Sequence, residues 1–185
     1  REITELLSEQ KDPVYTDEAI FRRVKKVYDQ RDSLGLDQEA MRLLELKYRG
    51  FLRSGVSLGP ESKARVEEIN ARIEQLDGQF SQNLLAATKG YTLFVSDRGD
   101  LQGLPPFSIG AARAFARARG HEQGWLFGLN RSRFEDFMAY ASNRELRRQM
   151  FEAYTSRGLG GDHDNRAVLL EIVRLRAERA VLLGY

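Results

Sequence analysis

Apolar residues recur every three or four positions through most of the first 90 residues. This spacing places them on one face of an α-helix. Three such stretches lie at about 16–30, 37–55 and 60–88. The first starts at Thr16 with acidic residues in its first turn, Asp37 caps the second, and Pro60 suits the first turn of the third. Because the links between them are short, we expect these helices to pack antiparallel.

The pattern changes after residue 90. Residues 91–96 and 125–129 are rich in aromatic and aliphatic side chains, and each predicts a short strand, the two pairing as a ribbon. An Ala- and Arg-rich helix is expected at 108–120, and two further helices over 134–157, the second capped by Asn143. The predicted fold class is therefore mostly α: a multi-helix, bundle-like fragment with a small two-stranded β ribbon.

The length and composition suit a single globular unit. The 185 residues are 42% hydrophobic and 30% charged, which is typical of a globular rather than a disordered chain. We expect one helical fragment over 1–185. Its expected parts are long antiparallel helices (1–89), the ribbon with a loop and a short helix (90–130), and a helical hairpin with a terminal core helix (131–185).

Composition also limits where the protein acts. No apolar run approaches the roughly 20 residues needed to span a bilayer, so no membrane partner is expected. Cysteine is absent, which excludes disulfides and thiolate metal sites and suits a reducing compartment. We expect a cytoplasmic location. The chain begins with Arg1 rather than methionine, so we also expect it to be a piece of a longer product.

Basic residues change character along the chain. Residues 111–185 contain 13 basic residues, all arginine, against nine acidic ones, whereas residues 1–110 contain 16 against 18. An Arg-rich surface suits an anionic partner such as nucleic acid. A helical protein with interspersed charges gives the same count. The second interpretation is favoured because each Arg cluster has Glu or Asp close by, so no nucleic-acid partner is expected.

The histidines do not form a metal-binding motif. Only His121 and His163 are present. The stretch HEQGW begins like the zinc-peptidase signature H-E-x-x-H, which needs two imidazoles one helical turn apart and a glutamate beside the metal-bound water. Here the fifth residue is Trp125, and His121 follows Gly120 into a predicted strand. We therefore predict no metal site at His121 and Glu122.

Other short motifs are equally weak. The stretch DHD, Asp162 to Asp164, offers metal ligands, but adjacent residues rarely converge on one ion, and Asp164 or Asn165 is expected to cap the final helix. The glycines of 158–161 lack the preceding strand and the following lysine of a phosphate-binding loop. The residues alone assign no catalytic, cofactor-binding or metal-binding role to any position.

The final stretch, from Asp164 to Tyr185, is apolar over more than half of the helical circumference. A helix that is apolar nearly all round belongs in the middle of a larger structure. Two arginines fall inside the apolar sector and need partners. We expect part of the face that carries Leu169, Val173 and Ala180 to be exposed in this chain.

Several stretches occur in an order similar to that of a known family. RDSLGLDQEAMRLLELKYRGFLRSGVSL is followed by INARIEQLDGQFSQNLL, and then by WLFGL, YASNRELRRQMFEAYTSRG and DNRAVLLEIVRLRAERAVLLGY. The combination of the last two stretches is the most specific part. Together, over nearly the whole chain, they resemble the N-terminal half of the bacterial peptidyl-dipeptidases, which are relatives of oligopeptidase A and thimet oligopeptidase.

The resemblance implies a large, almost wholly helical zinc metallopeptidase with a deep channel for short, unstructured peptides. In that family two histidines of H-E-x-x-H and a downstream glutamate bind zinc, and the Glu of the motif is the general base. This chain ends before the motif. Zinc is therefore expected in the parent enzyme and none in this chain, which should be inactive alone. Its expected partners are the C-terminal catalytic part of its own chain and short peptide substrates, with this part forming the wall or lid of the channel.

Two other functions stay open. The charged helices suit a helical protein-interaction module, and the Arg-rich last third suits a nucleic-acid-binding domain. An H-E-x-x-H motif further along the reading frame would separate the peptidase from both alternatives.

Overall fold

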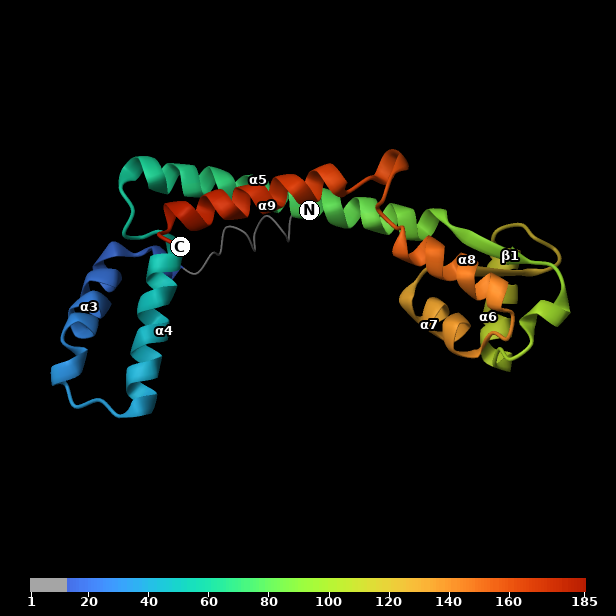
Figure 1. Ribbon diagram of the computed structural model, residues 1–185, viewed down its shortest axis with the longest axis horizontal. Coiled ribbons are helices and arrows are strands. Elements are labelled where there is room, and N and C mark those ends of the chain that lie inside the picture. The colour runs from blue at the N-terminus through green and yellow to red at the C-terminus, as the bar shows by residue number, and fades with distance from the viewer. Residues whose placement is uncertain (1–12) are drawn as a thin grey trace. The chain divides into compact units, whose positions relative to one another are not determined.

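The computed structural model describes residues 13–185, and this part of the chain is mostly helical with one two-stranded sheet (Figure 1). The predicted fold class is confirmed. The α-helices are α2 (Pro13–Thr16), α3 (Glu18–Asp29), α4 (Gln38–Ser54), α5 (Pro60–Gly90), α6 (Pro106–Ala118), α7 (Arg131–Tyr140), α8 (Arg144–Thr155) and α9 (Arg166–Leu182). The strands are β1 (Thr92–Val95) and β2 (Trp125–Gly128). Within residues 13–185, no helix is both long and apolar enough to cross a membrane.

The chain divides into two compact units. Unit 1 comprises Arg1–Glu74, described from residue 13, together with Val173–Tyr185, and unit 2 comprises Gln75–Ile172. Both α5 and α9 therefore contribute residues to each unit. The boundaries expected after residues 89 and 130 were placed where the predicted secondary structure changes. The two compact units are instead defined by which residues pack together in space.

A helical hairpin of α3 and α4 forms one part of unit 1, and the two helices lie side by side in Figure 1. Asp17 caps α3, and its carboxylate accepts hydrogen bonds from two backbone N–H groups of the first turn at 2.7 and 3.0 Å. Asp37 caps α4 as predicted, accepting from the Ala40 N–H at 2.7 Å. Gly55 ends this helix in the left-handed conformation with φ 81°.

Aromatic rings fill the space between α3 and α4. The buried side chains of this cluster are Phe21, Phe51 and Val56. The ring centroids of Phe21 and Phe51 lie 5.8 Å apart, and those of Tyr28 and Tyr48 lie 3.9 Å apart. Such ring pairs add to the stability gained from burial, so a few aromatic side chains hold this hairpin together.

In unit 1 the first half of α5 is tied to the second half of α9. Arg65 Nε donates to Glu178 Oε1 at 2.7 Å, and Arg179 Nη1 donates to Asn70 Oδ1 at 2.6 Å. The buried residues of α5 in this unit are Val66, Ile69 and Ile73. The antiparallel packing expected of three consecutive helices therefore holds for α3 and α4, whereas α5 is hydrogen-bonded to α9.

Unit 2 is built around the predicted ribbon. β1 and β2 pair antiparallel, with Thr92 opposite Gly128 and Val95 opposite Trp125. Alternate residues of β1 point inward, and Phe94 between them is exposed. Ten of the buried core residues of this unit form one cluster: Leu93, Val95, Leu101, Leu104, Ala112, Phe127, Leu129, Phe137, Ala141 and Met150.

Backbone contacts fix the loop before α6 to the end of α7. The Ser142 N–H donates to the Gln102 carbonyl at 2.8 Å. Gly103 has φ 91°, and a Cβ there would collide with the Tyr140 carbonyl oxygen. Glycine is therefore required at this position. Asn143 caps α8 as predicted, its side-chain oxygen accepting from two backbone N–H groups at 3.0 and 3.2 Å.

The start of α9 is anchored in unit 2 by a buried amide. Asn165 is 5% exposed; its Nδ2 donates to the Phe80 carbonyl at 3.0 Å, and its Oδ1 accepts from Asn83 at 2.9 Å. Its side chain therefore faces α5. The other expected cap residue, Asp164, lies one position earlier and accepts from the Arg166 N–H, at the first residue of the helix, at 3.0 Å.

The apolar side chains of α9 are divided between buried and exposed positions. Val168 and Ile172 are buried. Those at least 50% exposed are Leu169, Leu170, Val173 and Val181. The exposure predicted for Leu169 and Val173 is confirmed, whereas Ala180 is partly buried.

Candidate functional site

His121 and Glu122 lie in the turn between α6 and β2 and not in a helix. Gly120, with φ 84°, follows α6, and the His121 N–H donates to the Ala116 carbonyl at 3.0 Å. The imidazole packs against the Phe94 ring with a centroid distance of 5.0 Å. The helical geometry that H-E-x-x-H requires is therefore missing from this stretch, in agreement with its interpretation from the sequence.

The stretch DHD does not converge on a common point. His163 ends a short 3-10 turn and is exposed, as is Asp162. Arg166 binds Asp164 through its backbone N–H at 3.0 Å and through Nη2 at 2.6 Å. The guanidinium and the N–H hold the pKa of the Asp164 carboxyl well below its usual range. Within residues 13–185, no group of three or more His, Asp or Glu side chains lies close enough together to hold a metal ion.

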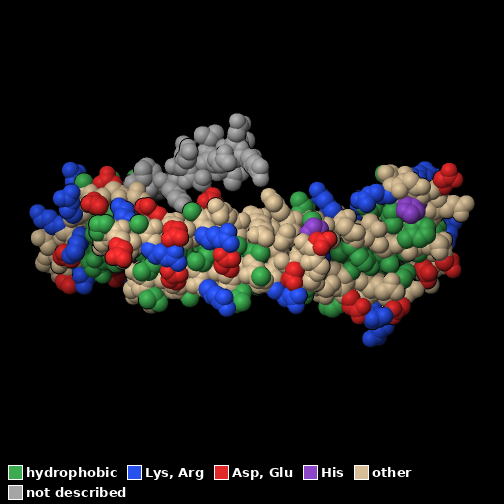
Figure 2. All heavy atoms as spheres, turned by 90° about the horizontal axis from the view of Figure 1, so that it is seen from above, with side chains coloured by type: hydrophobic (Ala, Val, Ile, Leu, Met, Phe, Trp, Pro, Cys, Tyr) green, Lys and Arg blue, Asp and Glu red, His purple; other side chains and the backbone are tan. Residues whose placement is uncertain are grey.

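Arginines of the last third pair with carboxylates on the same helix. Arg148 Nε donates to Glu145 at 3.0 Å, and its Nη1 donates to Glu152 at 2.7 Å. Arg131 pairs with Glu135 at 2.7 Å. Figure 2 shows acidic and basic side chains interspersed over one face of the molecule. Such mixing favours a solvated helical surface over a basic stripe for nucleic acid.

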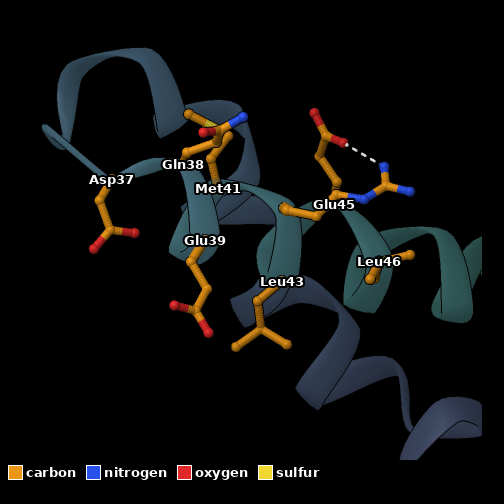
Figure 3. Close-up of a pocket in the computed structure, with 8 residues that line it drawn as sticks. Asp37, Gln38, Glu39, Met41, Leu43, Glu45 and Leu46 are labelled. Carbon is orange, nitrogen blue, oxygen red and sulfur yellow. Dashed lines mark hydrogen bonds and ion pairs between the residues drawn. The ribbon is translucent and has the colours of Figure 1, made fainter.

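A hollow of about 1040 Å³ lies along α4 in unit 1 (Figure 3). Its lining residues are Asp37, Gln38, Glu39, Met41, Arg42, Leu43, Glu45 and Leu46. Glu39 and Leu43 point to the same side of the helix, and Glu45 pairs with Arg42 at 3.1 Å. Catalytic groups must converge on a reacting atom from several directions. One helix and its cap supply every group here, so the surface suits contact with a partner better than catalysis.

A second hollow in unit 1, of about 620 Å³, is bounded by α2, α4, α5 and α9. Arg53, Lys63 and Arg179 supply three positive charges, against one carboxylate from Glu67. Arg179 is already bound to Asn70, 109 positions away in the sequence. Charged and apolar side chains both line the hollow, and tertiary packing alone brings them together, so no sequence pattern could have predicted it.

Comparison with known proteins identifies relatives of the chain. No family model matches it. It is 38% identical to the dipeptidyl carboxypeptidase of Salmonella typhimurium over 93% of this chain and 25% of that protein. It is 34% identical to oligopeptidase A of Escherichia coli (97% of this chain, 27% of that protein). It is 33% identical to the probable cytosolic oligopeptidase A of Arabidopsis thaliana (90% and 24%).

The matches cover almost all of this chain, which spans about a quarter of the length of these curated relatives. All three relatives carry the names of peptidases. The resemblance seen in the ordered sequence stretches is thus confirmed. This chain belongs to the thimet oligopeptidase and oligopeptidase A family, which includes the dipeptidyl carboxypeptidases.

Proposed function

We propose that this chain is a non-catalytic, N-terminal part of a zinc-dependent peptidase that hydrolyses short, unstructured peptides. The observation that carries the proposal is the 38% identity to a dipeptidyl carboxypeptidase over 93% of this chain but only 25% of that protein. The remainder of such a protein has room for the zinc site and the general base. In the parent, zinc would polarise the scissile carbonyl and activate a water molecule.

The described residues themselves support a role in building the enzyme. Leu169 and Leu170 in unit 2, and Val173 and Val181 in unit 1, are exposed on α9. Exposed apolar side chains that recur along a helix mark a surface that another element covers. We assign this covering element to the catalytic part of the same polypeptide.

The proposed role of this part is to form the wall or lid of the substrate channel. A narrow channel would admit flexible peptides and keep folded proteins from the zinc. The absence of cysteine from the sequence suits a reducing compartment, and we propose that the parent acts in the cytoplasm.

A helical protein-interaction module is the second candidate. The half-exposed Leu43 and Leu46 beside the hollow on α4 favour it. In that case a partner protein would bind the isolated chain without any peptidase activity. The peptidase proposal therefore requires an H-E-x-x-H motif further along the reading frame, whereas an interaction module does not.

The test compares the 185-residue chain with the same chain extended through the family's H-E-x-x-H region. The extended protein should cleave a short, internally quenched peptide, a chelator should abolish cleavage, and a folded protein should stay intact. The 185-residue chain should leave the peptide uncut with or without zinc. Cleavage by the short chain, or an inactive but folded extended protein, would overturn the proposal.

Substitutions in the extended protein test whether this part holds catalytic groups. His121→Ala, Glu122→Ala and His163→Ala should each leave turnover within a few-fold of the parent, because none of the three lies in a metal-binding arrangement. Loss of an essential catalytic group lowers the rate by about 10³-fold. A loss of that size at any of these positions would place chemistry in this part of the enzyme.

A further inference from the structure

A smaller hollow, of about 250 Å³, lies in unit 2 where α6, α7 and β2 meet. Its buried apolar lining consists of Leu104, Ala112, Phe127 and Phe137. Phe107, which also lines the hollow, is 67% exposed. The hollow is thus an apolar cup that is open to solvent on one side.

Two opposite charges stand at the edge of this cup. Ser108, only 9% exposed, donates its hydroxyl hydrogen to Asp136 Oδ2 at 2.9 Å and so fixes the carboxylate. The guanidinium carbon of Arg133 lies 4.3 Å from the centroid of the Phe115 ring, which holds the cation in place. Both Arg133 and Asp136 line the hollow.

The two charges do not neutralise each other. Arg133 and Asp136 are three positions apart on α7, a spacing at which opposite charges commonly pair. Within residues 13–185, neither takes part in an ion pair, and the contacts of each are those given above. One positive and one negative group are therefore held separately beside an apolar cup.

We propose that this hollow binds a free apolar amino acid in its zwitterionic form. The side chain would occupy the apolar cup, the ammonium group would bind Asp136, and the carboxylate would bind Arg133, whose planar guanidinium suits carboxylates. A cavity of roughly 150 Å³ holds one benzene molecule. A volume of about 250 Å³ therefore has room for one such ring and a short backbone.

Other ligand types fit the charges less well. A purely cationic ligand meets the positive Arg133, and a purely anionic one meets the negative Asp136. An uncharged apolar group satisfies neither. A zwitterion places a complementary charge against each of the two groups. Such binding would not require the proposed peptidase function.

Titration of the ¹⁵N-labelled 185-residue chain, monitored by NMR, tests the proposal. The probes are L-phenylalanine and N-acetyl-L-phenylalaninamide, which has the same side chain but no charges. L-phenylalanine should shift resonances of α6 and α7 saturably, with a dissociation constant on the order of 1 mM. The neutral analogue should bind at least about tenfold more weakly. Equal affinity for both, or no saturable shift in a well-dispersed spectrum, would overturn the proposal.

Variants locate the site. Arg133→Gln and Asp136→Asn should each weaken L-phenylalanine binding about tenfold, because each removes one charge-assisted contact. Ala111→Leu should block the opening of the hollow, which Ala111 lines. Ala114→Leu, at an exposed position of the same helix and not among the lining residues, is the matched control and should bind normally. Unchanged binding by folded Arg133→Gln and Asp136→Asn would also refute the assignment.

Discussion

The two compact units of this chain are stabilised in different ways. In unit 2, ten buried residues from the ribbon, α6, α7, α8 and their connections form one continuous core. In the α3–α4 hairpin of unit 1, three buried residues form the cluster and partly buried aromatic rings surround it. A ribbon covered by helices encloses many side chains on several sides, whereas a pair of helices encloses only a few. Unit 2 is therefore expected to be the more resistant to local unfolding.

The polar contacts between α5 and α9 show the same difference. In unit 2 the contact is made by the buried side-chain amide of Asn165, whose oxygen and nitrogen both form hydrogen bonds with α5. In unit 1 the contacts between α5 and α9 include the ion pair of Arg65 and Glu178, whose side chains are about 40% exposed. Exposed ion pairs contribute little to stability. Buried, fully bonded amides are costly to disrupt.

The largest expected effect comes from removing one ring from each core. Phe137→Ala in unit 2 should cost about 4 kcal/mol, because Phe137 is 0% exposed and a cavity would remain. Phe51→Ala in unit 1 should cost about 3 kcal/mol, at the low end for such a change, because the partly buried rings around it can relax into the space.

Native-state hydrogen exchange measures the two units separately. Phe151→Ala, at a half-exposed position of α8, is the control and should change the free energy of unfolding by less than about 0.5 kcal/mol. If Phe51→Ala proved as costly as Phe137→Ala, the hairpin would be as well enclosed as unit 2, and the contrast between the units would be wrong.

An intermediate effect is expected at the α5–α9 contacts. Asn165→Ala should cost about 2 kcal/mol, because it removes two hydrogen bonds and leaves the amide of Asn83 without its partner. Asn70→Ala should cost about 0.5 kcal/mol, because water in the adjoining hollow can replace its bond to Arg179.

Denaturant unfolding measures both losses. A double-mutant cycle with Asn83→Ala isolates the contact of Asn83 with Asn165. Equal costs for Asn165→Ala and Asn70→Ala would remove the distinction between a buried and a hydrated contact.

The smallest expected effect on stability comes from exposed ion pairs and depends on pH. The guanidinium of Arg65 lowers the pKa of Glu178, and that of Arg148 lowers the pKa of Glu145. Because the folded-state pKa is below the unfolded one, each carboxylate stabilises the fold at neutral pH, and this stability is lost as the pH falls through the folded-state pKa. Glu178→Gln and Glu145→Gln should therefore lower Tm slightly at pH 7 and not at the acidic end of the titration.

Thermal unfolding followed by circular dichroism at several pH values provides the measurement. Added salt should reduce both differences, since the pairs are exposed. A loss that persisted unchanged in acid would mean that packing of the side chains, and not their charge, stabilises these positions.

Local sequence patterns predicted most of the secondary structure. Asp37 and Asn143 were identified as helix caps because a short polar side chain precedes an apolar periodic stretch, and both accept the expected backbone hydrogen bonds. Which helices pack together was harder to predict. The contact of Arg179 with Asn70 spans 109 positions, and neither residue carries a local signal of the other.

The candidate sites also show that local sequence patterns do not predict contacts between distant residues. The missing second histidine and the glycine after α6 were enough to reject His121 as part of H-E-x-x-H. The hollow beside Arg133 and Asp136 was not foreseen, because it depends on α6, α7 and β2 meeting around it. Its charges look like ordinary surface residues when only the sequence is read.

The sequence by itself determined the periodicity of the helices, the ribbon and the family of this chain. These properties depend on residues that are close in sequence, or on the order in which short stretches occur, and so they can be read along the chain. Only the tertiary structure decided that Asn165 turns inward and that Ala180 is partly buried. It also decided that Asp136 bonds to Ser108 instead of the nearby arginine. Burial and pairing depend on which faces meet in space, and residues far apart in the sequence supply those faces.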